Sequence, residues 1–248
     1  MPVDYLSRLT DHQRTARSNL HLGMVLAFVA GALNAGGFLA IGLYTSHMTG
    51  LISMVADEIV LGQFVLAISA VLAVGSFVSG AATTALLVNY SHRRWPRHPY
   101  IPSLLLEAAL LLIFGLVGRR LLQHEIVSLS MTAILLCFAM GLQNALITKI
   151  SNAEIRTTHL TGLLTDIGIE LGKMFYWNRT ADVPGEQRVQ ANLAKLHIHV
   201  RLVICFFVGG LCGALGFKHV GFVTTVPLAL TLVTLALANL IRPGSQSR

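Results

Sequence analysis

Two copies of a short His-x-Thr-Gly motif are the part of this sequence best suited to chemistry. The six residues are His47, Thr49, Gly50, His159, Thr161 and Gly162. We predict that each threonine is a helix N-cap and that each glycine allows another backbone to approach. If each motif opens a half-helix inside a membrane, its free amides and partial positive charge would favour an anion or a polar solute. The alternative is that each motif is a capped turn at the membrane surface.

Polar side chains inside apolar segments form a second group of candidates. Asn34 and Asn144 lie in corresponding apolar stretches, where their amide groups either bond to a neighbouring helix or line a path. Glu107 lies within the apolar stretch 103–117. It either snorkels to the membrane surface or forms a buried carboxylate that titrates or pairs with a motif histidine.

Carboxylates follow both motifs, namely Asp57, Glu58, Asp166 and Glu170. His159, Asp166 and Glu170 are spaced so that they would share one helix face if the second half-helix begins early enough. Such a face could carry protons or a cation, and a wetted surface face is the alternative. We predict that Glu58 and the two later acids belong to a substrate or ion path.

Other kinds of site are disfavoured by the sequence. The three cysteines fall in apolar segments without metal-ligand spacing, so we expect no metal and no cofactor. No nucleophile lies in a recognisable catalytic motif, so we expect no enzyme activity. The net charge of +7 comes from basic residues that flank apolar runs, and no basic face interleaved with aromatics indicates nucleic-acid binding.

The elements that position these residues must be membrane helices. The chain is 54% hydrophobic and only 12% charged, and it has no charged side chain between Leu22 and Ala56 or between Ile59 and Ser91. About 20 apolar residues cross a bilayer as a helix, and apolar runs without alternation exclude a barrel. We place six spans, listed by residue number as 22–43, 64–89, 101–117, 128–148, 198–217 and 221–241.

Charge bias gives the topology. Arginines precede the first span and follow the second, and the rule that basic loops stay in the cytoplasm places both segments inside. An even number of crossings must separate them, so the segment 44–63 should not cross the membrane. Both termini are then cytoplasmic, with an N-terminal segment 1–21, a cytoplasmic linker 178–197 and a tail 242–248 around one membrane domain, 22–241.

The chain also carries an internal duplication. The segment 45–51 recurs as 157–163 at an offset of 112, which also carries Glu58 onto Glu170. Segment 31–35 resembles 141–145, and a glycine-containing pattern at 74–80 resembles 208–214 at an offset of 134. Repeat one (22–120) and repeat two (126–241) would each contain three spans and a half-helix after the first span. Three spans are an odd number, so the repeats would be inverted.

The sequence resembles the YoaK family of bacterial multi-pass inner-membrane proteins over nearly its whole length. The resemblance is carried by Gly31, Asn34 and the run Ser46, His47, Thr49 and Gly50. Two positions depart from the family pattern, since Asn34 stands where an acid is common and Leu51 where an asparagine is common. The family has no assigned activity, so the resemblance implies location and fold.

Together these features predict an all-α polytopic helical bundle in the bacterial inner membrane. Its expected function is a small-solute or ion transporter or channel, with a site at the interface of the inverted repeats. The alternatives are a membrane-embedded scaffold or regulatory partner without transport and, third, a membrane-embedded enzyme. The expected partners are the lipid bilayer and a small solute or ion, and a homo-oligomer is compatible with the sequence.

Overall fold

The structure, a computed structural model, describes residues 16–96, 98–121, 125–151, 158–176 and 189–238. Within these ranges all regular elements are helices. They are α2 (Ala16–Ile41), α3 (Met48–Val60), α4 (Phe64–Arg94), α5 (Ile101–Leu121), α6 (Glu125–Ile150), α7 (Leu160–Phe175), α8 (Leu193–His219), the 3-10 turn η1 (Gly221–Thr224) and α9 (Thr225–Ala238).

Four of the described helices are long and apolar enough to cross a membrane, namely α2, α4, α6 and α8. Two shorter apolar helices, α5 and α9, complete the bundle. This confirms a helical membrane protein with several crossings. The long helices form because their segments lack charges and strand-like alternation, so that in lipid the backbone amides must bond within each helix.

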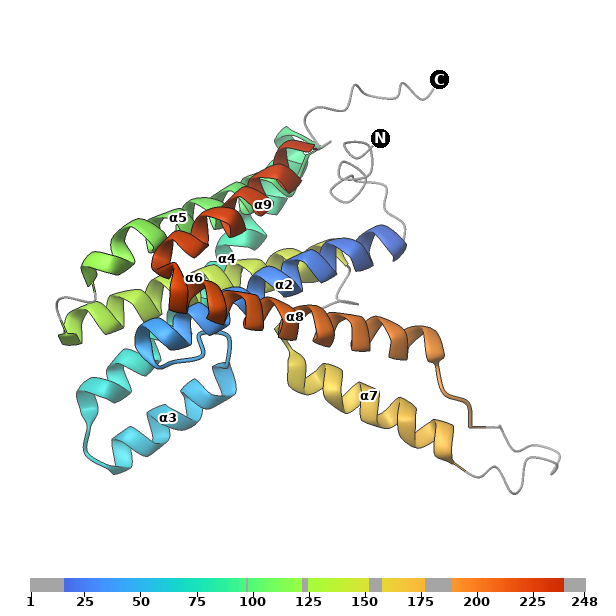
Figure 1. Ribbon diagram of the computed structural model, residues 1–248, viewed down its shortest axis with the longest axis horizontal. Helices are drawn as coiled ribbons and strands as arrows, with labels where there is room; N and C mark the ends of the chain where they lie inside the picture. Colours follow the sequence, from blue (N-terminus) through green and yellow to red (C-terminus); the bar gives the residue numbers. More distant parts are fainter. Residues whose placement is uncertain (1–15, 97, 122–124, 152–157, 177–188, 239–248) are drawn as a thin grey trace.

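Helix α3 lies in the segment 44–63, which was expected not to cross. Its 13 residues make a rod about 20 Å long, shorter than the roughly 30 Å of a hydrocarbon core. Helix α7 has 16 residues and follows the second motif. In Figure 1, α3 and α7 lie on the same side of the long helices and splay toward opposite ends of the molecule.

The long helices pair as α2 with α8 and α4 with α6, while α5 pairs with α9. Hydrogen bonds give the direction of the α4–α6 pair. Ser76 Oγ donates to the Ile134 carbonyl oxygen and, eight residues later on both helices, Thr84 Oγ1 donates to that of Leu142. These two helices are therefore parallel.

Glycine contacts give the direction of the other two pairs. Gly209 of α8 meets the backbone of Phe28 in α2, and Gly213 meets that of Ala32. Residue numbers therefore increase in the same direction along both helices, which are parallel. In the third pair Gly115 meets Thr225 and Gly118 meets Phe222, so the numbering runs in opposite senses. Helices α5 and α9 are therefore antiparallel.

The two parallel crossings are built alike. At the α2–α8 crossing, Gly31 lies on the Phe206 backbone and Gly209 on that of Phe28. At the α4–α6 crossing, Gly141 lies on the Phe77 backbone and Gly80 on that of Phe138. Adding 110 to a residue number in α2 gives the equivalent position in α6, as for Gly31 and Gly141. Adding 129 to a residue number in α4 gives the equivalent position in α8, as for Gly80 and Gly209.

This packing corrects the offset of 134 that the sequence match gave for α4 and α8. A Cβ on Gly75 would meet nothing within 4 Å, and Ser79 is exposed, with its hydroxyl bonded to the Gly75 carbonyl oxygen of its own helix. Gly75 and Ser79 therefore do not face the partner helix, whereas Gly209 and Gly213, their counterparts in the sequence match, do. The glycine pattern misled because α4 carries glycines on two different faces.

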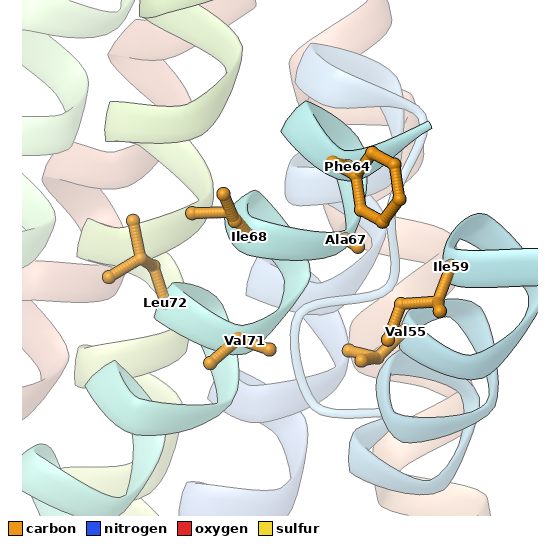
Figure 2. A pocket seen from close by; sticks show the side chains of 7 residues that line it. All are labelled: Val55, Ile59, Phe64, Ala67, Ile68, Val71 and Leu72. Atoms are coloured by element: carbon orange, nitrogen blue, oxygen red, sulfur yellow. The ribbon is translucent and has the colours of Figure 1, made fainter. Parts of the chain in front are cut away.

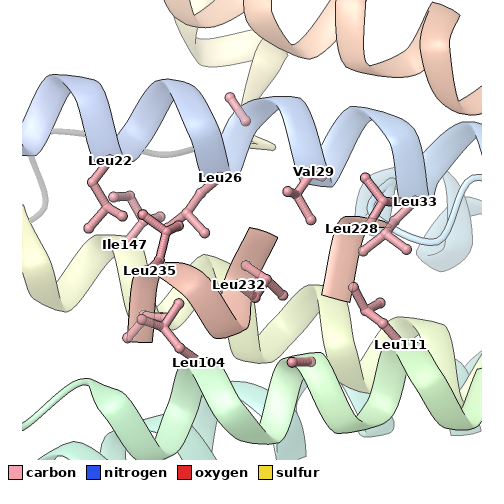
Figure 3. Packing of buried hydrophobic residues seen from close by; sticks show 14 of the residues in the cluster. Leu22, Leu26, Val29, Leu33, Leu104, Leu111, Ile147, Leu228, Leu232 and Leu235 are labelled. Carbon is pink, nitrogen blue, oxygen red and sulfur yellow. The ribbon is translucent and has the colours of Figure 1, made fainter. Parts of the chain in front are cut away.

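One buried apolar cluster joins the halves. It combines residues of α2, α5, α6 and α9, and Figure 3 shows leucines from α2, α5 and α9 pointing into the same space. Leu26, Leu104 and Leu232 are each fully buried in it. Helix α7 contributes Leu163, so the start of α7 contacts this core. Helix α8 begins at Leu193, five residues before the expected start of its span.

Candidate functional site

The first motif opens helix α3, although not in the way the sequence indicated. The N-cap residue is His47 and not Thr49, and no side chain makes a capping hydrogen bond. Thr49 lies in the first helical turn, with its hydroxyl 3.5 Å from His47 Nδ1. The imidazole folds over Gly50, where a Cβ would lie 2.7 Å from His47 Nε2. The glycine is needed because it leaves room for this ring.

The second motif repeats this arrangement at the start of α7. His159 is the N-cap and again makes no side-chain capping bond, so the expected cap at Thr161 was also wrong. A Cβ on Gly162 would lie 2.5 Å from His159 Cε1. Both histidines are exposed in the protein alone. Each motif therefore places an imidazole over the first turn of a short helix, beside its free amides.

Asn34 holds the loop that leads to the first motif. Its Oδ1 accepts hydrogen bonds from Ser46 N at 3.2 Å and from Ser46 Oγ at 2.9 Å. Asn34 lies seven residues before the end of α2 at Ile41, which corresponds to about 10 Å along the helix. The chain therefore turns back along α2 by two turns before α3 begins.

Asn144 occupies the corresponding place in α6 at an offset of 110. Its side chain is half-buried, and its backbone carbonyl accepts a hydrogen bond from Thr148 Oγ1 at 2.7 Å. The loop that would correspond to Ser46 and its neighbours includes residues 152–157, which lie outside the described residues.

Two buried residues that the sequence analysis did not select help to hold the loop before α3 and helix α2 against α6. Thr45 is fully buried, and its carbonyl oxygen is 3.5 Å from the Cys137 thiol, which donates to it. Gln143 is fully buried and donates from Nε2 to the Leu26 carbonyl oxygen at 2.9 Å. Gln143 could have been found as an amide inside an apolar span, by the same reasoning that selected Asn144 beside it.

The acids of the second half form a partly buried polar network between α7 and α8, in which Glu170 and His199 are buried. Glu170 accepts from Lys173 Nζ at 2.9 Å and from the backbone N–H of Asn192 at 2.6 Å. Asp166 lies 3.1 Å from Lys195 Nζ and 3.7 Å from His199 Nδ1. These contacts tie α7 to the start of α8, so they account for both acids without a proton or cation path.

The hydrogen bonds also set the charge of Glu170. The bond from Lys173 is the largest effect, and together with the Asn192 N–H it lowers the pKa of Glu170 below its ordinary value. Glu170 is therefore an ionised carboxylate at neutral pH. Its counterpart Glu58 is half-buried, and one of its carboxyl oxygens has no hydrogen-bond partner among the described residues.

Glu107 is separate from both motifs. It is fully buried, and within the described part of the chain neither carboxyl oxygen has a hydrogen-bond partner. Of the two alternatives for Glu107, this burial favours the buried carboxylate over the snorkelling side chain, and among the described residues no hydrogen bond joins it to a motif histidine. Among the residues searched, no group of three His, Cys, Asp or Glu side chains could hold a metal ion.

A groove lies between α3 and α4, next to the first half-helix. Its volume is about 300 Å³, and its lining is wholly apolar, as Figure 2 shows. The lining residues are Val55, Ile59, Phe64, Ala67, Ile68, Val71 and Leu72. None of the candidate site residues lines it, so this groove fits an apolar chain better than a polar solute.

Comparison with known proteins places the chain in a family. It is 25% identical over 228 residues to the UPF0700 transmembrane protein YoaK of Bacillus subtilis (strain 168), which covers 90% of this chain and 95% of the relative. No solved structure gives a significant match. The family described as "Protein of unknown function (DUF1275)" matches residues 22–238. The apolar helices agree with the description of YoaK as a transmembrane protein, and the chain belongs to this family of unknown function.

Proposed function

We propose that the protein is a small-solute or ion transporter or channel, built from two inverted halves around a path between the motifs. The first half consists of α2 to α5 and the second of α6 to α9. Each half contributes three crossings and one broken segment. The protein is proposed to act without catalysis, by rocking or gating of the halves around the central path.

The reciprocal packing of the long helices supports an inverted repeat. A two-fold rotation that exchanges the halves must turn the α2–α8 pair into the α6–α4 pair and must map the α5–α9 pair onto itself. The glycine contacts agree with this exchange, because Gly31 and Gly141 each lie on the backbone of a phenylalanine in the partner helix. The helix directions also agree with six crossings, since α2 and α8 run parallel and α5 and α9 antiparallel.

The broken segments are the observation that carries the transport proposal. The loop before α3 bonds to Asn34 about 10 Å before the end of α2, so α3 begins inside the bundle and leads back toward the start of α4. Helix α7 begins against the central core through Leu163 and ends beside the start of α8 through Glu170. In inverted-repeat transporters, broken helices in corresponding positions form the substrate site.

The orientation follows from charge. Arg93 and Arg94 end α4, at the side of the bundle where α2 and α8 begin. Basic residues favour the cytoplasmic side, so we place both termini and the linker between α7 and α8 inside the cell, in the bacterial inner membrane. Residues 178–188 of that linker and both terminal segments lie outside the described residues.

Water access to the two motifs tests this proposal without knowledge of the solute. Thr49→Cys and Thr161→Cys, each in a protein with Cys137, Cys205 and Cys212 replaced, are treated in vesicles with a membrane-impermeant cationic thiol reagent. Both threonines are exposed in the protein alone, and Val78→Cys, an exposed apolar position near the middle of α4, is the unreactive control.

A central path predicts that both motif cysteines react with reagent added on one side of the membrane. Reaction of each only from its own side would mean that the motifs are surface turns, and no reaction from either side would mean that no water reaches them. Either of these results would contradict the proposal. Where uptake of a solute is found, His47→Ala with His159→Ala should abolish it while the protein remains folded and inserted.

A further inference from the structure

Unpaired polar atoms are concentrated in the hairpin of α4 and α5. Among the described residues, buried side-chain atoms without a hydrogen-bond partner include Ser91 Oγ, His98 Nδ1, Ser103 Oγ and both carboxyl oxygens of Glu107. Ser91, Ser103 and Glu107 are each fully buried. Buried polar groups are normally paired, so such a concentration needs an explanation, and an absent ligand is one.

The hairpin aligns these groups along one direction. Ser103 and Glu107 are four residues apart on α5, so they lie on the same face with their Cβ atoms about 5–6 Å apart. Ser91 lies one turn before the end of α4, at a similar depth to Ser103 because the two helices meet at the loop 95–100. His98 belongs to that loop. The polar atoms therefore extend from the loop toward Glu107.

Glu107 lies at the inner end of this series, in apolar surroundings. It is six residues, or about 9 Å, from the start of α5. Leu104, Ala108 and Leu111 of the same helix belong to the central apolar cluster, and Figure 3 shows Leu104 and Leu111 facing the leucines of α9. An ionised carboxylate without a partner is strongly disfavoured in such a place, so the group must take up a proton or a cation.

Among the described residues, no side chain of the neighbouring helices forms an ion pair with Glu107. Helices α4, α6, η1 and α9 pack against α5, and the described parts of η1 and α9 contain no titratable residue. On α6, Cys137 donates to Thr45 and Lys149 is exposed and donates to Asn89.

The titratable groups of α4 that could approach lie in its last turns. They are Tyr90, His92, Arg93 and Arg94, of which His92 is half-buried and stacks edge to face on Tyr100. Along α5 itself, Arg119 is twelve residues or about 18 Å beyond Glu107. Glu125 is the first residue of α6, beyond the far end of α5. The described residues therefore show no ion pair to Glu107.

We propose that Glu107 is a proton-binding site, protonated in the resting protein and reached from the α4–α5 loop along the hydroxyls of Ser91 and Ser103. A metal ion fits poorly, because hard cations take six or more oxygen ligands and one carboxylate with two hydroxyls offers too few. A proton needs a single oxygen, and each hydroxyl can both accept and donate it. The binding of this proton does not depend on transport, whereas its use as a coupling ion rests on the proposed function.

Dicyclohexylcarbodiimide tests the site directly, because it modifies protonated carboxyl groups in apolar surroundings. The full chain in lipid nanodiscs is treated at pH 7, and the adduct is located by peptide mass spectrometry. We expect one main adduct, on Glu107, with a yield that falls as pH rises. Glu107→Gln should reduce labelling to background, whereas Glu170→Gln should not, because Glu170 is ionised and paired.

Infrared spectroscopy of the same samples provides a second measurement. A protonated carboxyl band should be present in the wild type, absent in Glu107→Gln and shifted in Ser103→Ala, which removes the hydroxyl one turn away on the same face of α5. An adduct on other carboxylates alone, or a Glu107 carboxyl that absorbs as an ionised group at pH 7, would overturn the proposal. If Glu107 is labelled but the motif cysteines do not react from either side, the proton site stands and the proposed transport function is rejected.

Discussion

The close helix crossings make a quantitative prediction about symmetry. A Cβ on Gly31 would lie 2.9 Å from the carbonyl carbon of Phe206 in α8. A Cβ on Gly141, its counterpart in α6, would lie 2.8 Å from the carbonyl carbon of Phe77 in α4. Ordinary contacts begin near 3.4 Å, so each alanine would have to push two backbones apart by at least half an ångström.

The expected cost follows from the rigidity of the partner. Overpacking costs about 1–3 kcal/mol, and the upper end applies here because the contacted atoms are backbone. Better helix propensity returns about 1 kcal/mol, so Gly31→Ala and Gly141→Ala should each lose about 2 kcal/mol. That loss corresponds to a fall in Tm on the order of 4–8 °C for a chain of this size. Gly75→Ala is the control and should be neutral or stabilising, since its Cβ meets open space.

The assay is thermal unfolding of the purified variants in one detergent, followed by intrinsic fluorescence and by the loss of the monodisperse peak on size exclusion. The two crossing variants should behave alike within the error of the measurement, because the repeat places them in equivalent contacts. A large loss for Gly31→Ala with none for Gly141→Ala would refute the equivalence of the crossings. Equal losses for all three variants would refute the packing argument.

Three further predictions concern the motifs and their supports. Asn34→Ala should cost about 1–3 kcal/mol and increase hydrogen exchange in the loop before α3, whereas Asn34→Asp, which keeps the acceptor, should not. Gly50→Ala should displace the His47 ring and change its reactivity with diethyl pyrocarbonate, with little change in Tm because the ring can swing away. The hydrogen bond from Lys173 lowers the pKa of Glu170, so the ionised Glu170 should raise Tm at neutral pH, and this gain should decline as pH falls below 4.5. The Tm of Glu170→Gln should lack this pH dependence.

The membrane helices could be predicted from the sequence because their signal is local. Apolar runs bounded by basic residues indicated each crossing element, and helix starts at Phe64 and Ile101 were placed correctly. The offset between α4 and α8 could not be read, because it depends on which glycine faces the partner backbone. That choice is made by packing between distant segments, and a match of residue types at 74–80 does not reveal it.

The candidate site was predictable in its residues and less so in their contacts. The pairing of Asn34 with Ser46 needs the chain to turn back along α2, which no local pattern shows. The glycine of each motif was selected for backbone approach, but it makes room for the histidine three residues earlier. Glu107 was recognised as an acid in an apolar span, whereas its complete burial depends on helices that join the bundle later in the chain.

The central claim is that the two halves cross the membrane in opposite senses, and the sidedness of two glutamines tests it most directly. Gln63 precedes α4 and Gln190 precedes α8, its counterpart, and both are exposed. Each is changed to cysteine in the cysteine-free protein, and intact cells are treated with a membrane-impermeant maleimide. We predict that Gln63→Cys is labelled from outside and that Gln190→Cys is labelled only after the cells are opened. Labelling of both cysteines from the same side would contradict the inverted arrangement.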